Sequence, residues 1–165
     1  MKLSDIMSTD PVTLTLAHTI REASRVFIDH EIDGAPVIDE HGRMAGLLTK
    51  SHLYRVLAGD GDPNATVGQI MTTSVLTGHP DEKVRNLIKR SVGRLPVVDQ
   101  DKVVGMITRS DLAYAYFNSF IYLSNELQTI LDSTHNLIVA IDKNARITLV
   151  NRAAENFLDI KSTDV

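Results

Sequence analysis

The apolar and polar positions of this chain follow one pattern twice. A short lead-in is followed by an alternating strand, an amphipathic helix, a hairpin of two apolar strands and a closing helix. In the first copy we predict these elements at residues 2–7, 12–16, 19–30, 34–38, 44–49 and 50–58. The pattern predicts a mixed α/β (α+β) unit of the order βαββα.

The second copy repeats this order after a linker at residues 59–65, which is rich in glycine and aspartate and contains a proline. Between Met71 and Pro96 it is about four residues shorter than the first copy, which is close to one helical turn. Two matching units predict a pseudo-twofold pair with a shared core. The expected elements of this copy lie at residues 67–71, 74–77, 83–91, 94–99 and 103–108.

Each copy ends its hairpin with a glycine, apolar residues and then Thr-x-Ser at a predicted helix start. A helix start presents free backbone N–H groups and the positive end of the dipole, so it can hold an anion such as phosphate. Thr108 can hydrogen-bond a phosphate oxygen, and Asp111 can accept from the two hydroxyls of a ribose. The alternative is a capping box, in which Thr108 and Asp111 hydrogen-bond each other.

The first copy has His52 where the second has Asp111. A neutral imidazole lacks the ionised acceptor that a ribose diol favours. Four outcomes stay open for this copy: an empty site, a phosphate at His52, a different ligand, or a plain surface histidine.

The two copies resemble tandem cystathionine-β-synthase (CBS) domains, also called a Bateman module. The resemblance covers about residues 1–118. It implies regulatory binding of AMP, ADP, ATP or S-adenosylmethionine in clefts between the repeats, pairing into flat dimers, and no required cofactor. Besides the two Gly…Thr-x-Ser stretches, it rests on Asp5-Ile6-Met7 with Gln69-Ile70-Met71 and on Ala35-Pro36-Val37-Ile38-Asp39 with Leu95-Pro96-Val97-Val98-Asp99.

The resemblance also points to ligand contacts at the helix starts, before each Pro-Val and in the first strands. Apolar strand residues would form the adenine wall, with simple core packing as the alternative. Isolated basic residues could neutralise phosphate or be solvated. The candidate nucleotide-binding residues are Thr108, Arg109, Ser110, Asp111, Val75, Thr77, Arg94, Leu95 and Pro96, together with Thr13, Ala35, Pro36, Thr49 and His52.

Composition narrows the function classes. The 165 residues include no cysteine, which excludes disulfides and Cys-ligated zinc and favours a cytoplasmic setting. The net charge of −4 gives no support for broad nucleic-acid binding, and no apolar run approaches the ~20 residues of a membrane span. P-loop and nucleophile-elbow motifs are missing, and the six histidines lack metal-ligand spacing. We therefore expect no enzyme, no metal, no membrane and no direct nucleic-acid contact.

Aromatic residues gather after the second repeat, with five of the eight lying between Tyr114 and Tyr122. Apolar residues spaced 4, 3, 4 and 3 apart predict a short heptad seam and hence a homodimer. The alternative is that the aromatics cap the CBS core. The seam residues are Tyr116, Phe120, Leu123, Leu127 and Ile130.

Residues 137–142 and 146–151 predict a β-hairpin around Lys143-Asn144, followed by a helix at 152–158. Together with residues 127–132, they resemble the beginning of a PAS sensory domain. Only about 40 residues are present where a PAS fold needs about 100. We therefore expect an incomplete sheet and cofactor pocket, in a fragment of a longer signalling protein.

The expected organisation is CBS repeat 1 at 1–58, a linker at 59–65, CBS repeat 2 at 66–118, a connecting helix at 119–135 and a truncated PAS start at 136–165. The expected function is that of an adenine-nucleotide-binding sensor module within a larger signalling or transcription-regulatory protein. The alternative is a structural dimerisation module without ligand, with sensing carried out by the downstream PAS domain.

Overall fold

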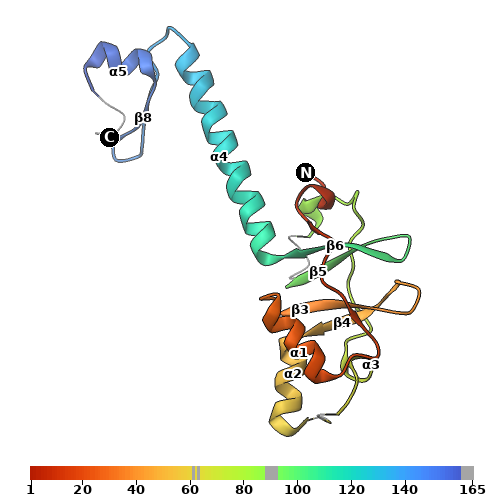
Figure 1. The fold of residues 1–165 in the computed structure, drawn as a ribbon. Coiled ribbons are helices and arrows are strands. Elements are labelled where there is room, and N and C mark those ends of the chain that lie inside the picture. Colours follow the sequence, from red (N-terminus) through yellow and green to blue (C-terminus); the bar gives the residue numbers. More distant parts are fainter. Residues whose placement is uncertain (61, 63, 88–92, 161–165) are drawn as a thin grey trace. The chain divides into compact units, whose positions relative to one another are not determined.

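The computed structural model describes residues 1–60, 62, 64–87 and 93–160. It divides into two compact units, Met1–Ala113 and Tyr114–Val165 (Figure 1). The first unit contains both repeats, each built on a three-stranded sheet. The second unit contains most of the long helix α4 (Arg109–Ser133), a two-stranded hairpin and a short helix.

The sheet of the first repeat has the strand order β2-β3-β4. Strand β2 (Leu14–Thr15) runs parallel to β3 (Gly34–Ile38), which forms an antiparallel hairpin with β4 (Met44–Thr49). Helix α1 (Ile20–Asp29) joins β2 to β3 and buries Phe27. A capping box starts this helix, because the Glu22 N–H donates to Thr19 Oγ1 at 3.2 Å and the Thr19 N–H donates to Glu22 Oε2 at 2.8 Å.

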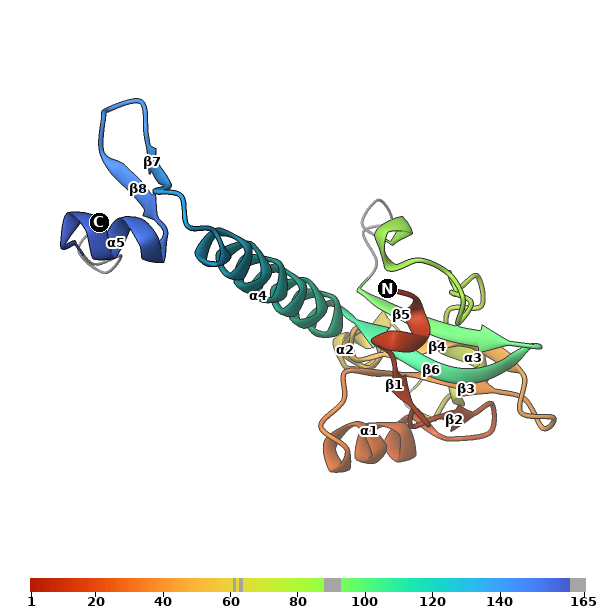
Figure 2. The same ribbon diagram turned by 90° about the horizontal axis from the view of Figure 1, so that it is seen from above.

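The sheet of the second repeat has the order β1-β6-β5 and includes a strand from the start of the chain. Strand β1 (Ser8–Thr9) pairs antiparallel with β6 (Lys102–Thr108), which forms a hairpin with β5 (Arg94–Asp99) (Figure 2). The reverse contact is made by Thr72, which exchanges backbone hydrogen bonds of 2.9 and 3.0 Å with Leu47 of β4. The lead-in of each repeat therefore pairs with a strand of the other repeat.

The two hydrophobic cores show the same exchange. The second core contains Leu3 from the 3₁₀ helix η1 (Leu3–Asp5), and Met7 packs against it. The first core contains Val67 from helix α3 (Val67–Ile70), and Met71 packs against it. Each methionine lies on a glycine of the other repeat. A Cβ on Gly105 would be 2.5 Å from Met7 Sδ, and one on Gly46 would overlap Met71 Sδ.

This reciprocal packing gives a physical reason for the paired Ile-Met and glycine motifs in the sequence. A side chain larger than hydrogen at either glycine would displace the methionine that covers it.

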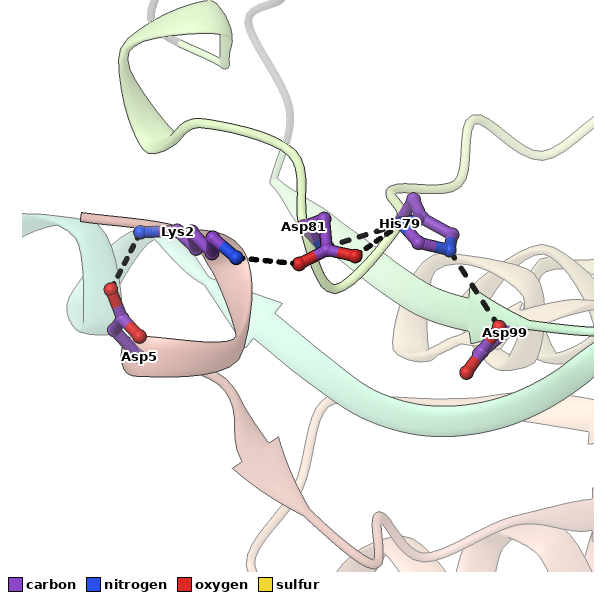
Figure 3. Close-up of polar contacts among 5 residues, drawn as sticks. All are labelled: Lys2, Asp5, His79, Asp81 and Asp99. Atoms are coloured by element: carbon purple, nitrogen blue, oxygen red, sulfur yellow. Dashed lines mark hydrogen bonds and ion pairs between the residues drawn. The ribbon is translucent and has the colours of Figure 1, made fainter.

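Polar contacts fix the first residues of the chain to the second repeat (Figure 3). Lys2 Nζ lies 2.7 Å from Asp81 Oδ1, and the Lys2 N–H donates to Asp5 Oδ2 at 2.7 Å. His79 stands between Asp81, at 3.9 Å, and Asp99, at 3.6 Å. These side chains are about half exposed or more, so the pairs add little stability and chiefly orient the lead-in.

Several predicted elements differ from the observed ones. The predicted strand at 12–16 is reduced to β2, and residues 74–77 form no strand; only Gly78 beyond them bridges to Val97. The predicted helix at 50–58 becomes α2 (Lys50–Arg55), followed by one π turn (Val56–Asp60) in which Gly59 has φ of 94°. The predicted helix at 83–91 begins as a 3₁₀ turn (Val84–Asn86), and its residues from 88 lie outside the described residues.

The second unit is organised around one buried asparagine. Strands β7 (Val139–Ile141) and β8 (Ile147–Val150) form the expected hairpin, and helix α5 (Arg152–Leu158) follows it. Asn151 is fully buried between them. Its Oδ1 accepts from the N–H groups of Ile138 at 2.9 Å and Ala154 at 3.1 Å, and its Nδ2 donates to the C=O of Leu131 at 3.0 Å. One side chain thus joins the end of α4 to the hairpin and to α5.

Helix α4 carries apolar side chains that are exposed in this chain. The exposed fraction is 70% for Phe120, 54% for Leu123 and 52% for Leu127. In the first half of the helix exposed aromatics also lie outside the seam, at Tyr114, Phe117 and Tyr122. A stretch of this size is unusual on a soluble monomer. Across the part of the chain that the structure describes, no helix combines the length and apolar character needed to cross a membrane.

Candidate ligand pocket between the repeats

A pocket of about 750 Å³ lies between the two repeats. The first repeat contributes the turn after β1 and the start of β3, while the second contributes the start of β5, the end of β6 and the start of α4. The volume is within the range of sites for small organic ligands. The lining residues are Ser8, Thr9, Asp10, Pro11, Val12, Glu31, Ile32, Asp33, Gly34, Pro36, Gly93, Arg94, Met106, Thr108, Arg109 and Ser110.

The start of α4 supplies polar groups to one wall of this pocket. Thr108, Arg109 and Ser110 line it, whereas Asp111, the next residue of α4, is half-buried and is not among the lining residues. Asp111 Oδ2 accepts from the Thr108 N–H at 2.7 Å and from the Thr108 hydroxyl at 2.7 Å, while the Asp111 N–H donates to Thr108 Oγ1 at 3.3 Å. The capping box considered from sequence is therefore formed, and it uses Oδ2 of the carboxylate.

His52 makes the matching cap in the first repeat. Its Nδ1 lies 3.1 Å from the Thr49 N–H nitrogen and 2.9 Å from Thr49 Oγ1. Because a backbone N–H only donates, Nδ1 accepts, so in the neutral ring Nε2 carries the proton and donates to Thr72 Oγ1 at 3.1 Å. Burial and the nearby Arg55 cation lower the pKa of His52, which favours this neutral ring.

Two cations meet one carboxylate beside the pocket. Asp33 Oδ1 lies 2.5 Å from Lys50 Nζ, and Asp33 Oδ2 lies 2.9 Å from Arg94 Nη2. The hydrogen bond and charge of Lys50, followed by the charge of Arg94, lower the pKa of Asp33. The carboxylate is therefore ionised at neutral pH, and it links the two repeats.

The structure brings five of the sequence-predicted site residues together in this pocket: Pro36, Arg94, Thr108, Arg109 and Ser110. Leu95 and Ala35 lie in the two cores, and Pro96 is also buried. Thr49 and His52 form the cap of α2, and Thr13 is half-buried next to the lining residue Val12. Val75 and Thr77 line a separate hollow of about 500 Å³ near Asp39, Arg43 and Asp101.

On the first-repeat side of the pocket, sequence reasoning singled out Pro36 but not Asp10, Pro11 or Asp33, which carry no binding motif. The available signal was position: Asp10-Pro11 follows the lead-in that crosses to the other repeat, and Asp33 precedes the predicted hairpin strand. Within the described residues, His, Asp and Glu side chains form no group of three suited to a metal ion.

Comparison with protein families and solved structures places this fold. The CBS domain family matches residues 3–59 and 67–118, and the PAS fold matches residues 125–165. The CBS domain pair of protein MJ0100, solved in complex with 5′-methylthioadenosine and S-adenosyl-L-methionine, is 32% identical with a TM-score of 0.65, over 72% of this chain and 98% of that one. A putative acetoin utilization protein, AcuB, from Vibrio cholerae gives a TM-score of 0.69 at 25% identity, over 75% of this chain and 97% of that one.

Curated relatives share the repeats in different contexts. The CBS domain-containing protein YhcV of Bacillus subtilis is 30% identical over 116 residues, which are 67% of this chain and 82% of YhcV. An L-aspartate semialdehyde sulfurtransferase of Methanocaldococcus jannaschii is 34% identical over 67% of this chain, but the match spans only 22% of that enzyme. The matched part is thus a module shared by proteins of different activity. The chain belongs to the CBS domain family, as a tandem pair followed by a segment that matches the PAS fold.

Proposed function

We propose that the CBS pair binds an adenosyl ligand in the pocket between the repeats and acts as a regulatory module rather than an enzyme. The observation that carries this proposal is the pocket itself, which takes its walls from both repeats and opens onto the start of α4. A ligand held there contacts both repeats at once. Its binding free energy therefore depends on how the repeats are arranged.

The ligand class is supported by pocket size and by likeness. A volume of about 750 Å³ accommodates an adenosine group with a 5′ substituent. The similar MJ0100 pair was solved with two adenosyl compounds. In this chain the Ser110 hydroxyl would donate to a polar group of the ligand, and Thr108 Oγ1, whose proton goes to Asp111, would accept. Asp111 Oδ1, which the cap does not use, would accept from a ribose hydroxyl.

The proposed output runs through helix α4. This helix begins at the pocket and continues without a break to Ser133, next to the segment that matches the PAS fold. Its exposed seam would pair with a second copy, giving a homodimer. The context would be a larger signalling or transcription-regulatory protein in the cytoplasm. Ligand binding would favour one arrangement of the repeats, and α4 would transmit this change to the segment that matches the PAS fold.

Isothermal titration calorimetry with 5′-methylthioadenosine, S-adenosylmethionine, AMP and ATP tests the proposal. We expect one dominant site per chain. Asp111→Ala should weaken binding by roughly 1.5–3 kcal/mol, the range for hydrogen bonds involving a charged group, which is on the order of ten- to a hundred-fold in affinity. His52→Ala is the matched control, because it removes the equivalent cap at the start of α2, a helix that contributes no residue to the pocket lining.

The possible outcomes distinguish three alternatives. If both variants lose stability equally and bind the ligand equally well, Asp111 is a cap alone. If His52→Ala abolishes binding while Asp111→Ala does not, the ligand belongs to the other repeat. If none of the four compounds produces heat on titration, the result would favour the alternative of a ligand-free dimerisation module with sensing in the PAS segment.

A further inference from the structure

Asp33 occupies an unusual position for a pocket that would receive a phosphate. Two arginines line the pocket, and Arg94 is the more buried of them, with a side chain only one-quarter exposed. Its guanidinium is already paired with Asp33 at 2.9 Å. The same carboxylate holds Lys50 at 2.5 Å, and the Asp33 C=O accepts from the Lys50 N–H at 2.8 Å. Backbone and side chain together fix Asp33 between one cation from each repeat.

The charges around this pair are mixed. Among the described residues, the pocket is lined by three carboxylates, Asp10, Glu31 and Asp33, and by two guanidiniums, Arg94 and Arg109, while Lys50 pairs with Asp33. The second repeat has Gly93 at the position equivalent to Asp33, so the carboxylate is present on one side only. A phosphate that binds Arg94 must displace Asp33 or lie beside its carboxylate, and both cost free energy.

We propose that Asp33 sets the ligand specificity of this pocket by occupying Arg94, so that the pocket selects adenosyl ligands without a phosphate, such as uncharged 5′-thioadenosines or sulfonium compounds, over AMP, ADP and ATP. This inference rests on the proposed function and specifies its ligand class. An uncharged 5′ group leaves the Asp33–Arg94 pair intact, and a sulfonium cation does not compete with Asp33 for Arg94.

The experiment compares 5′-methylthioadenosine with AMP by calorimetry on the full chain. These two ligands share the adenosine group and differ at the 5′ position. We expect the wild-type chain to bind 5′-methylthioadenosine at least ten-fold more tightly than AMP. Asp33→Asn should tighten AMP binding about ten-fold and change 5′-methylthioadenosine binding less than two-fold. Asp33→Glu keeps the charge and should keep the wild-type preference.

Asp81→Asn is the matched control, because it removes an exposed carboxylate paired with a lysine at 2.7 Å, outside this pocket (Figure 3). It should leave both affinities unchanged. Unchanged AMP affinity in Asp33→Asn, with 5′-methylthioadenosine still bound, would overturn the inference and leave the proposed function standing. AMP binding that appears only in Asp33→Asn would support the inference. If no variant binds either compound, the proposed function fails and the inference falls with it.

Discussion

A carboxylate and an imidazole perform the same task at the two helix starts beside the repeats. Asp111 and His52 each stand three residues after a threonine and accept from its backbone N–H. The imidazole keeps this role only while Nδ1 is unprotonated. The cap of α2 is therefore sensitive to protonation.

This difference predicts a pH dependence of stability. The pKa of His52 is lowered, chiefly by burial and then by Arg55, so the unfolded chain binds the proton more readily than the folded one. The stabilisation is fully present above about pH 6.5, the ordinary value for histidine, and is lost as the pH falls through the folded pKa. Melting temperatures from pH 7.5 to 5.5 should fall more steeply for the wild type than for His52→Asn.

His135→Asn provides the control, since His135 is exposed in the second unit. It should keep the wild-type slope. A wild-type slope equal to that of His52→Asn would show that the cap of α2 does not titrate in this range.

At the scale of elements, the lead-ins are the parts whose placement determines the rest. Leu3 is fully buried in the core of the second repeat, although it stands at the beginning of the first. Gly78 closes over it, since a Cβ there would overlap Leu3 Cδ1. The second repeat is thus incomplete without residues from the beginning of the first.

Leu3→Ala should lower the free energy of unfolding by about 2–5 kcal/mol, because it leaves a cavity in a core that has little room to collapse. Urea unfolding followed by circular dichroism measures this loss. Leu76→Ala is the control, since the Leu76 side chain is about half exposed, and it should stay within about 0.5 kcal/mol of wild type. Similar small effects for both variants would mean that the lead-in is not part of the second core.

Elements defined by local pattern were predictable, and elements defined by distant pairing were not. The hairpins at 34–49 and 94–108, helix α1 and the hairpin of the second unit each carry their own periodicity. Strand β1 consists of two polar residues, Ser8 and Thr9, and is a strand only because β6 lies beside it. Residues 74–77 match the first strand of the other repeat in position but have no strand partner.

The same distinction between local pattern and distant pairing applies to the candidate site. The start of α4 was predictable because glycine, threonine and serine recur at a fixed spacing. Asp33 was not, since its importance comes from Lys50 and Arg94, which reach it only in the folded chain. The sequence could not show whether Thr108 and Asp111 form a helix cap or contact a ligand, because capping and ligand binding use the same residue types.

At the scale of the whole molecule, the exposed face of α4 predicts association. Light scattering at micromolar concentration should report about twice the chain mass of 18.2 kDa. Phe120→Glu combined with Leu127→Glu places charges in the seam and should give a monomer. Asn125→Glu adds a charge to the same helix away from the seam and should leave the dimer intact. A monomer in the wild type would remove α4 as the route of coupling.

The exchange of lead-ins also has a consequence for the order of events during synthesis. Leu3 and Met7 leave the ribosome about 100 residues before β6, which receives them, and this separation slows folding. The core of the first repeat likewise waits for Val67 and Met71. A ribosome that pauses between the repeats would therefore hold an unfinished first core, with Leu3 and Met7 exposed, and a chaperone that covers residues 1–9 until translation reaches β6 would raise the yield of native protein.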